Sequence, residues 1–236
     1  MDKSAFIERV LLIMNEAQMA DSQGNSFIGA NSAQVDKYIE GSYENAWRIL
    51  ANLVPRQWLT MNKCTNTVQG YSKGTGHIIL PDDYYMLGCF KLNGWKKAVY
   101  EASVEDERVA SIQSNPYTRG SVLRPVCTIS NVLTTTGSTT SIQRALNFYT
   151  SEAEDGSTPS VDIFLYVPCI TPLTELSSDD ELDLKTEIIE PMAYVTAGCV
   201  FTIFGQEQIG SGVSERGMLM VPGYKSVRGT NVTIKQ

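Results

Sequence analysis

Histidine is nearly absent from this 236-residue sequence, and its five cysteines lack the spacing of a metal site. His77 is the single histidine, and no two cysteines lie closer than twenty-five residues, so the C-x-x-C pattern of zinc and redox sites is missing. The odd number of cysteines also argues against a disulfide framework. We therefore predict reduced, buried thiols, no metal ion and no cofactor.

Long hydrophobic runs and a secretory signal are missing too. The apolar stretches, such as Val195 to Phe204, are interrupted by Thr and Gly and fall short of the roughly 20 residues that span a bilayer. The first residues, Met1-Asp2-Lys3-Ser4, lead directly into amphipathic sequence without the apolar segment of a signal peptide. We expect a soluble chain that folds in the cytosol where it is made, with no membrane contact.

Catalytic motifs are not found either. No G-x-S-x-G nucleophile accompanies His77, and the glycines around Lys73 have the wrong spacing for a phosphate-binding loop. The acidic pair Asp82-Asp83 lacks the further carboxylates of a calcium loop. These absences predict a protein that is not an enzyme and whose function resides in its surfaces.

Acidic residues outnumber basic ones, and the two signs are unevenly distributed. The formal net charge is −7, residues 151–190 carry eleven acidic side chains and one lysine, and residues 214–236 have a net charge of +3. This balance argues against a chain that clamps nucleic acid as a whole. The candidates for fixed negative charge are Asp179, Asp180, Glu181 and Asp183. The candidates for docking on acidic partner surfaces are Arg119, Arg124, Arg216, Lys225 and Arg228.

Two of these arginines flank a Pro-Tyr turn within residues 113–125. Arg119 and Arg124 are suited to bidentate binding of a phosphate or a carboxylate. A loop held by its own internal hydrogen bonds is the alternative, because such turns often need no ligand.

Two amphipathic helices are predicted near the N-terminus. Apolar residues at spacings of three and four predict a helix over residues 4–20. A second helix is predicted over residues 32–54, with Ser32 as its N-cap and a proline after its end. Tyr43 and Trp47 of this helix are candidates for an interface between subunits, with core packing as the alternative for Trp47.

From Cys64 onward the pattern changes to short β-rich runs separated by Gly, Pro and Asn. Asn93-Gly94 predicts a turn between two strands, and Ser103 predicts the cap of a short helix that ends at Ile112. The Thr- and Ser-rich residues 131–141 fit either a polar pair of strands or an exposed loop. The predicted strands are residues 76–80, 86–92, 97–101, 122–130 and 162–168.

A third helix is predicted over residues 183–204, although Pro191 is costly inside a helix. Its start is therefore expected near Ile189 or Glu190, which would place the proline in the first turn. Small residues leave a narrow face for another helix, and these interface candidates are Ala193, Ala197 and Gly198. The Gly-rich tail that follows is predicted to be an extended arm on a neighbouring subunit, with an arm folded back over its own bundle as the alternative.

The order of helices, strands and a returning helix predicts an α+β fold, a helical bundle with an inserted antiparallel β-rich module. The bundle comprises residues 1–62 and 174–205, and the module comprises residues 63–173. The arm comprises residues 206–236.

Six short motifs follow one another along the chain: Trp47-Arg48-Ile49-Leu50, Ile79-Leu80-Pro81-Asp82-Asp83-Tyr84, Trp95, Ser114-Asn115-Pro116-Tyr117 with Arg119, the acidic run Leu176 to Glu181, and Ile189-Glu190-Pro191-Met192-Ala193. In these motifs and their order the chain resembles the head-to-tail adaptors of short-tailed bacteriophages, the ring or tail-tubular-A type. The resemblance is strongest to the ring proteins of crAss-like Bacteroides phages. The Thr- and Ser-rich insertion at residues 131–141 departs from the pattern.

The resemblance implies a structural virion protein at the head-tail junction, made in the host cytoplasm. In that family the helical bundles pack side by side in a ring, usually of twelve copies, below the portal protein. The β module faces outward or toward the next tail ring or nozzle protein. Such a ring lengthens the channel for double-stranded DNA, which passes without specific binding, seals the portal after packaging and docks later tail components. The family has no catalytic, metal-binding or cofactor-binding residues to carry over.

A small-ligand or carbohydrate-binding module is the alternative function. Its basis is a set of aromatic residues in the β-rich part that is large enough for a sugar-binding platform: Tyr84, Tyr85, Trp95, Tyr100 and Tyr117. A hydrolase is disfavoured by the single histidine and the missing nucleophile motif. Ring formation separates the first two functions, because a binding module need not form rings.

Overall fold

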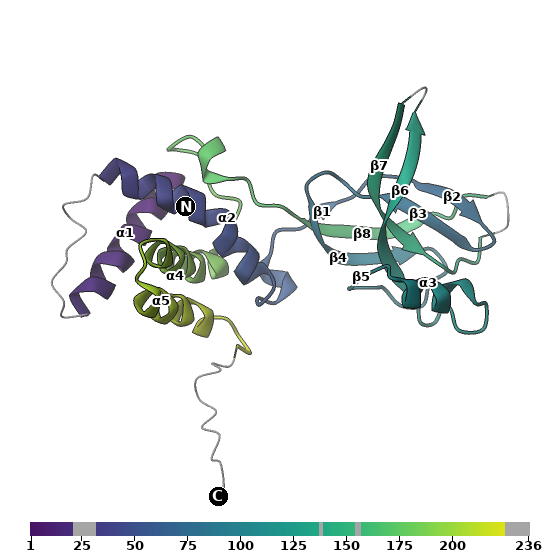
Figure 1. Cartoon of the computed structure of the whole chain (residues 1–236). Helices are drawn as coiled ribbons and strands as arrows, with labels where there is room; N and C mark the ends of the chain where they lie inside the picture. The colour runs from purple at the N-terminus through teal and green to yellow at the C-terminus, as the bar shows by residue number, and fades with distance from the viewer. Residues whose placement is uncertain (21–31, 137–138, 154–156, 225–236) are drawn as a thin grey trace, which may run out of the picture. The chain divides into compact units, whose positions relative to one another are not determined.

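The computed structural model describes residues 1–20, 32–136, 139–153 and 157–224, and Figure 1 labels its elements. The chain forms two units, a helical unit from residues 1–60 and 170–236 and a β unit from residues 61–169. Helices and two sheets together confirm the α+β fold class. The β unit is inserted between the two parts of the helical unit, and its limits lie close to the predicted residues 63 and 173.

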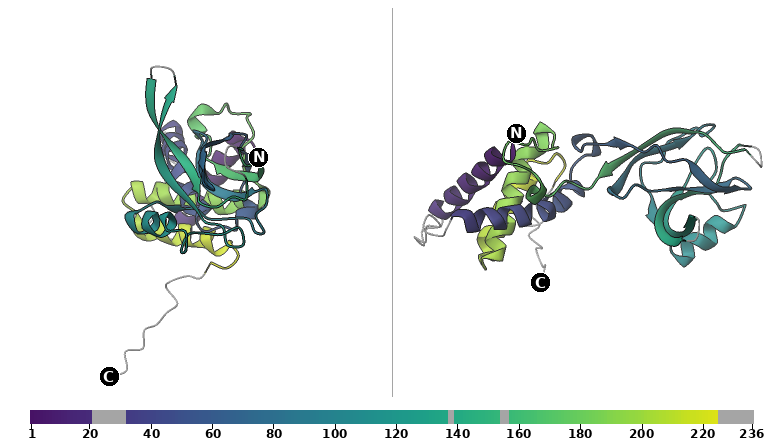
Figure 2. Two further views of the ribbon diagram at one scale, coloured as in Figure 1. Left: turned by 90° about the vertical axis from the view of Figure 1, so that its right-hand side faces the viewer. Right: turned by 90° about the horizontal axis from the view of Figure 1, so that it is seen from above.

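The described part of the helical unit contains four α-helices: α1 (Lys3–Ala20), α2 (Ser32–Ala51), α4 (Thr186–Ile203) and α5 (Glu207–Leu219). Helix α4 packs against the other three, and the helices of this unit cross one another in Figures 1 and 2. Because α4 has neighbours on several sides, many of its side chains are fully buried, among them Met192, Val195 and Phe201. None of the described helices is long and apolar enough to cross a membrane.

Burial confirms the amphipathic pattern of α2. The buried side chains are Val35, Ile39, Tyr43, Ala46 and Leu50. The helix ends at Ala51 and not at Val54, and Leu53 is 40% exposed. Pro55 follows Val54, and the residue before a proline avoids the helical conformation, so the helix cannot include Val54.

Helix α4 begins at Thr186, so the expected start near Ile189 or Glu190 is wrong. Pro191 lies inside the helix and is buried. A proline at this position cannot donate a hydrogen bond to the carbonyl group of Glu187, four residues earlier. The helix continues because tertiary packing of its buried residues, and not local propensity, supplies most of its stability.

Helix α5 lies where the sequence predicts an extended arm, so that prediction is wrong over residues 207–219. Gly210 and Gly217 of α5 face α4 at very short range. A Cβ atom on Gly198 of α4 would lie 2.6 Å from the carbonyl oxygen of Gly210. The small-residue face therefore receives a helix of the same chain, which agrees over this part with the folded-back alternative. Residues 225–236 lie outside the described residues.

The β unit contains two sheets with a common apolar core. The first has the order β1-β8-β4, with β1 (Asn62–Lys63), β8 (Val161–Pro168) and β4 (Tyr84–Leu92). The second has the order β2-β3-β7-β6-β5, with β2 (Val68–Ser72), β3 (Thr75–Ile79), β7 (Thr139–Phe148), β6 (Cys127–Thr136) and β5 (Ser103–Val104). Phe90 of β4 joins the two sheets, because its ring centroid lies 6.4 Å from that of Phe148 in β7 and 5.2 Å from that of Phe164 in β8.

Two of the predicted strands differ from the structure. Residues 97–101 form no strand, and only Val99 makes an isolated bridge, with Phe90. The turn at Asn93-Gly94 is present, with Gly94 at φ +88°, but the predicted second strand of its hairpin is reduced to this bridge. The strand predicted over residues 122–130 begins only at Cys127.

The short helix of the β unit also begins later than predicted. Ser103 belongs to strand β5, and helix α3 covers Glu107–Ser114. Its cap is Asp106, whose carboxylate accepts a hydrogen bond from the backbone N–H of Val109 at 2.7 Å. Aspartate and serine are comparable N-caps, so Asp106 can take this role while Ser103 pairs with β6 as part of strand β5.

Residues 131–141 belong to a hairpin, so of the two alternatives the strand pair is confirmed for the described residues. Strands β6 and β7 pair from Cys127↔Phe148 to Thr136↔Thr139. Other strands pair only with the base of this hairpin, β5 at residues 128–129 and β3 at residues 145–148. The N–H group of Leu80, just after β3, also donates to the carbonyl oxygen of Arg144 at 2.9 Å. The remainder, residues 131–136 and 139–143, projects beyond the sheet as a two-stranded ribbon (Figures 1 and 2), which we call the outer ribbon.

Candidate functional site

The predicted acidic candidates lie in an exposed segment between the 3-10 helix η3 (Leu173–Glu175) and α4. Asp179, Asp180, Glu181 and Asp183 are exposed, whereas Leu182 among them is 6% exposed. None of the four carboxylates forms an ion pair with any residue that the structure describes. The segment therefore presents uncompensated negative charge to solvent.

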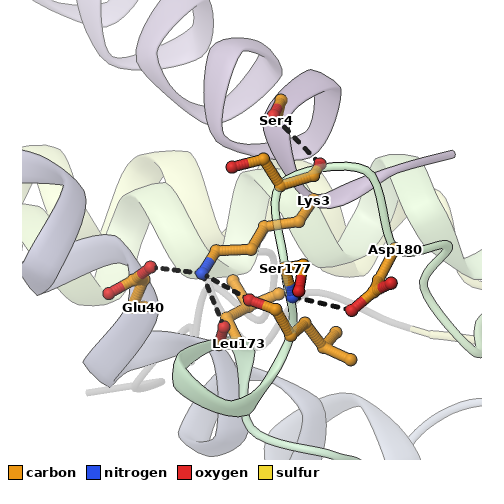
Figure 3. Close-up of polar contacts among 8 residues, drawn as sticks. Lys3, Ser4, Glu40, Leu173, Ser177 and Asp180 are labelled. Carbon is orange, nitrogen blue, oxygen red and sulfur yellow. Dashed lines mark hydrogen bonds and ion pairs between the residues drawn. The ribbon is translucent and has the colours of Figure 1, made fainter.

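The acidic segment is fixed to the N-terminal residues through its backbone (Figure 3). The N–H groups of Lys3 and Ser4 donate to the carbonyl oxygens of Asp180 and Ser178 at 3.1 and 3.2 Å. In the opposite direction, the N–H group of Leu182 donates to the carbonyl oxygen of Met1 at 3.0 Å. Through these bonds the segment pairs with residues 1–4 as two short antiparallel strands would. The backbone that carries the four carboxylates is therefore fixed in place.

Lys3 ties this region to two further elements. Its ammonium group donates to the carbonyl oxygens of Leu173 at 2.7 Å and Leu176 at 3.0 Å, and it pairs with Glu40 of α2 at 2.7 Å (Figure 3). The Lys3 side chain is 14% exposed. Its charge is thus used within the helical unit and does not neutralise the acidic segment.

Two of the acids have side-chain contacts that explain their orientation. The carboxylate of Asp180 accepts from the N–H group of Ser177 at 2.7 Å, which closes a local turn. The carboxylate of Asp183 accepts from the hydroxyl group of Thr60 at 3.2 Å. An amide side chain can accept the same bonds, so charge and structure can be separated experimentally at both positions.

The predicted interface candidates lie in the core of the helical unit and not on its surface. Tyr43 is 1% exposed and Trp47 is 5% exposed. Ala193 and Ala197 are fully buried, and Gly198 is covered by α5. Residues buried within their own chain cannot form a contact between subunits without unfolding, so the interface assignment is wrong, and core packing is confirmed for Trp47. The small residues of α4 do permit close packing of another helix, as predicted, but that helix is α5 of the same chain.

The described basic docking candidates are divided between the two units. Arg119 and Arg124 belong to the β unit, where Arg119 is half-buried and Arg124 is exposed. Arg216 is exposed on α5 in the helical unit. Lys225 and Arg228 lie outside the described residues. The loop that holds Arg119 is stabilised internally, since Gly120 N–H donates to the Gln113 side chain at 2.9 Å.

A groove of about 570 Å³ lies between α2, α4 and α5. Asn45, Cys199 and Met218 are among its lining residues. Burial raises the pKa of the Cys199 thiol, although a hydrogen bond from Asn45 opposes this. The thiol is thus protonated at neutral pH and is a poor nucleophile. The sequence did not predict this groove, because it depends on the helix α5 that was read as an arm.

The His, Cys, Asp and Glu side chains of the described part of the chain form no metal-binding cluster, since no group of three or more of them is placed to hold a metal ion. His77 lies on β3, and burial lowers its pKa, which favours the neutral imidazole. The thiols of Cys64, Cys89 and Cys127 also have raised pKa values, in each case mainly because of burial.

The aromatic residues proposed for a sugar-binding platform are divided between core and surface. Tyr84 and Trp95 are each 3% exposed and belong to the core of the β unit. Tyr100 and Tyr117 are 60% and 97% exposed. With two of its five members in the core, the platform loses the flat exposed surface that sugar stacking requires.

The sequence matches no protein-family model, and no curated protein matches it. The surfaces described above are therefore the basis for a function. The sequence did not predict that Lys3 anchors this region, because the acceptors are backbone carbonyl groups about 170 residues away. The strand pair at residues 131–141 was one of two predicted alternatives, but residues 142–148 were not predicted as a strand, although they continue β7.

Proposed function

We propose that the chain is a structural subunit that assembles into a ring with further copies, as a head-to-tail adaptor of a virion does. The ring extends a channel for double-stranded DNA below a portal protein and docks later tail components. The observation that carries the proposal is the acidic segment. It presents four exposed carboxylates without ion-pair partners on a backbone that is hydrogen-bonded to the N-terminal residues.

Fixed negative charge suits a channel through which a polyanion passes. Repetition of the same four carboxylates around a ring gives a band of like charge that repels phosphate groups and keeps DNA from adhering. A binding site would show the reverse arrangement, with acids paired or turned inward toward a ligand.

The proposal is tested in two steps. Native mass spectrometry of the full chain across a range of concentrations determines whether it forms rings. A strictly monomeric chain, alone and in the presence of its native complex, would overturn the proposal. The second step measures retention of duplex DNA on the assembled rings as a function of salt.

The variant for the second step replaces the four acids by amides, Asp179→Asn, Asp180→Asn, Glu181→Gln and Asp183→Asn. We expect an unchanged fold, with a stability change below about 1 kcal/mol, because exposed acids contribute little and the amides keep the acceptor oxygens. Rings of this variant should retain DNA at low salt, whereas wild-type rings should not.

A control variant removes the same number of charges at exposed positions outside the acidic segment and should behave as wild type: Asp82→Asn, Glu107→Gln, Glu152→Gln and Glu207→Gln. Equal DNA retention by both variants would contradict a local role for the acidic segment.

A further inference from the structure

The outer ribbon has unprotected edges. Natural edge strands usually carry charged residues or proline, which prevent pairing with another chain. From Cys127 to Gln143 the sequence contains neither. Each strand of the hairpin has one edge that faces away from the other strand. Among the described residues, no strand pairs with this edge of β6 after Ile129, and none pairs with this edge of β7 before Ala145. The ribbon therefore offers two edges, one on each strand.

One face of the ribbon continues the apolar face of the core. Residues two apart in a strand share a face, so the buried pair Cys127↔Phe148 is followed on this face by Ile129↔Leu146, Asn131↔Arg144 and Leu133↔Ile142. The guanidinium group of Arg144 lies over the Tyr84 ring, 5.4 Å from its centroid, so this charge is held at the base of the ribbon. Leu133 and Ile142 lie directly opposite each other and are 73% and 71% exposed. This apolar pair is thus placed outside the sheet, where nothing that the structure describes covers it.

The opposite face of the ribbon is polar and ordered. The Thr134 hydroxyl group donates to the side-chain oxygen of Gln143 at 2.7 Å and lies 3.1 Å from the Ser141 hydroxyl group. These cross-strand contacts fix the register of the hairpin. An isolated two-stranded hairpin is nevertheless only marginally stable in water, and further strands are needed to stabilise it.

We propose that the outer ribbon pairs edge to edge with the ribbon of the next copy of this chain, β6 of one copy beside β7 of its neighbour. This inference rests on the proposed ring. The two free edges lie on opposite sides of the ribbon, so a contact between different edges leaves one edge available on each copy. Such a heterologous contact repeats around a rotation axis until the ring closes.

The direction of the strands fits this arrangement. Rotation about an axis roughly along the ribbons keeps every ribbon pointing the same way. Strand β6 of one copy then runs antiparallel to β7 of the next, because the two strands of each hairpin run in opposite directions. Antiparallel pairing is the more stable kind, and closure of the ring removes every edge. The lack of charge between residues 127 and 143 means that copies meet without repulsion.

Hydrogen exchange of the full chain tests the inference without any substitution. In a two-stranded ribbon about half of the amide groups point outward and exchange rapidly. In the ring we expect these fast amides in both segments, 131–136 and 139–143, to become protected. Rings that form while both segments exchange as in the monomer would overturn the ribbon contact and leave the proposed function standing. Absence of any ring would overturn both, and protection of β6 alone in dimers would contradict the heterologous pairing.

A matched pair of variants gives an independent readout. Leu133→Lys combined with Ile142→Lys places like charges on the ribbon at positions that are already exposed. We expect self-association at least roughly tenfold weaker, the change that about 1.4 kcal/mol produces, with an unaltered circular dichroism spectrum. The control Tyr117→Lys adds charge at a position that is 97% exposed outside the ribbon, and it should associate as wild type. Equal association of both variants would overturn the inference.

Discussion

The contact between α4 and α5 can be tested at Gly198. A Cβ atom on Gly198 would lie 2.0 Å from the Ser214 hydroxyl oxygen, 2.6 Å from the Gly210 carbonyl oxygen and 2.9 Å from the Ser214 backbone nitrogen. The hydroxyl group can rotate away, but the two backbone atoms cannot move unless α5 does. Gly198→Ala therefore forces the two helices apart.

The size of the effect follows from two opposing contributions. Overpacking a core typically costs about 1–3 kcal/mol, and we expect the upper end because backbone atoms are in the way. Replacement of a helical glycine by alanine gains about 1 kcal/mol in helix propensity. We expect a net loss of about 2 kcal/mol in the free energy of unfolding of the helical unit. Thermal unfolding should then shift downward by several degrees, since 1 kcal/mol corresponds to roughly 2–8 °C for domains of this size range.

Gly212→Ala is the matched control, because a Cβ at Gly212 of α5 would meet no atom within 4 Å. This variant should gain about 0.4–1 kcal/mol. Far-ultraviolet circular dichroism at a helix band follows mainly the helical unit during thermal and urea unfolding, because the long helices lie in that unit. A Gly198→Ala protein as stable as wild type, or stabilised like Gly212→Ala, would refute the close packing of α5 on α4.

The remaining predictions concern the N-terminal anchor and the histidine. Lys3→Met removes the donor to the carbonyl groups of Leu173 and Leu176 and the partner of Glu40, so urea unfolding should show a loss of about 1.5–3 kcal/mol. His77 has a pKa lowered by burial, so the folded state binds fewer protons than the unfolded state. The stability of the β unit should therefore be complete above about pH 6.5 and decrease slightly as the pH falls toward the folded pKa, and His77→Gln should abolish this dependence in pH-resolved unfolding.

Helix patterns were the part of the fold that the sequence predicted best. The stripe of α2 is visible because its buried residues recur at spacings of three and four and its other face is polar. In α1 the buried face includes Phe6 and Ile13, which lie one residue away from apolar neighbours that fit the same spacing. Periodicity alone could not choose between the two faces, since only the tertiary contacts with α2 and α4 decide which is covered.

The strands and the candidate site depended on long-range contacts that local sequence does not contain. Residues 97–101 have a strand-like composition, yet their neighbour β4 is already paired with β8, and only one bridge forms. Helix α5 has low intrinsic helix propensity because of Gly210, Gly212 and Gly217, so it was read as an arm. Two of those glycines are what permits its close packing on α4, which stabilises the helix.

The correction at α5 changes where assembly contacts are to be sought. Residues chosen for subunit contact because they are small or aromatic, such as Ala197 and Trp47, serve the interior of one subunit. The features that remain exposed are of a different kind: a fixed acidic segment at residues 179–183 and an uncharged ribbon with Leu133 and Ile142 at its exposed face. One repels a polyanion and the other exposes backbone edges to pairing. The proposed ring needs both, because its copies would have to adhere to one another while DNA passing through them would not adhere.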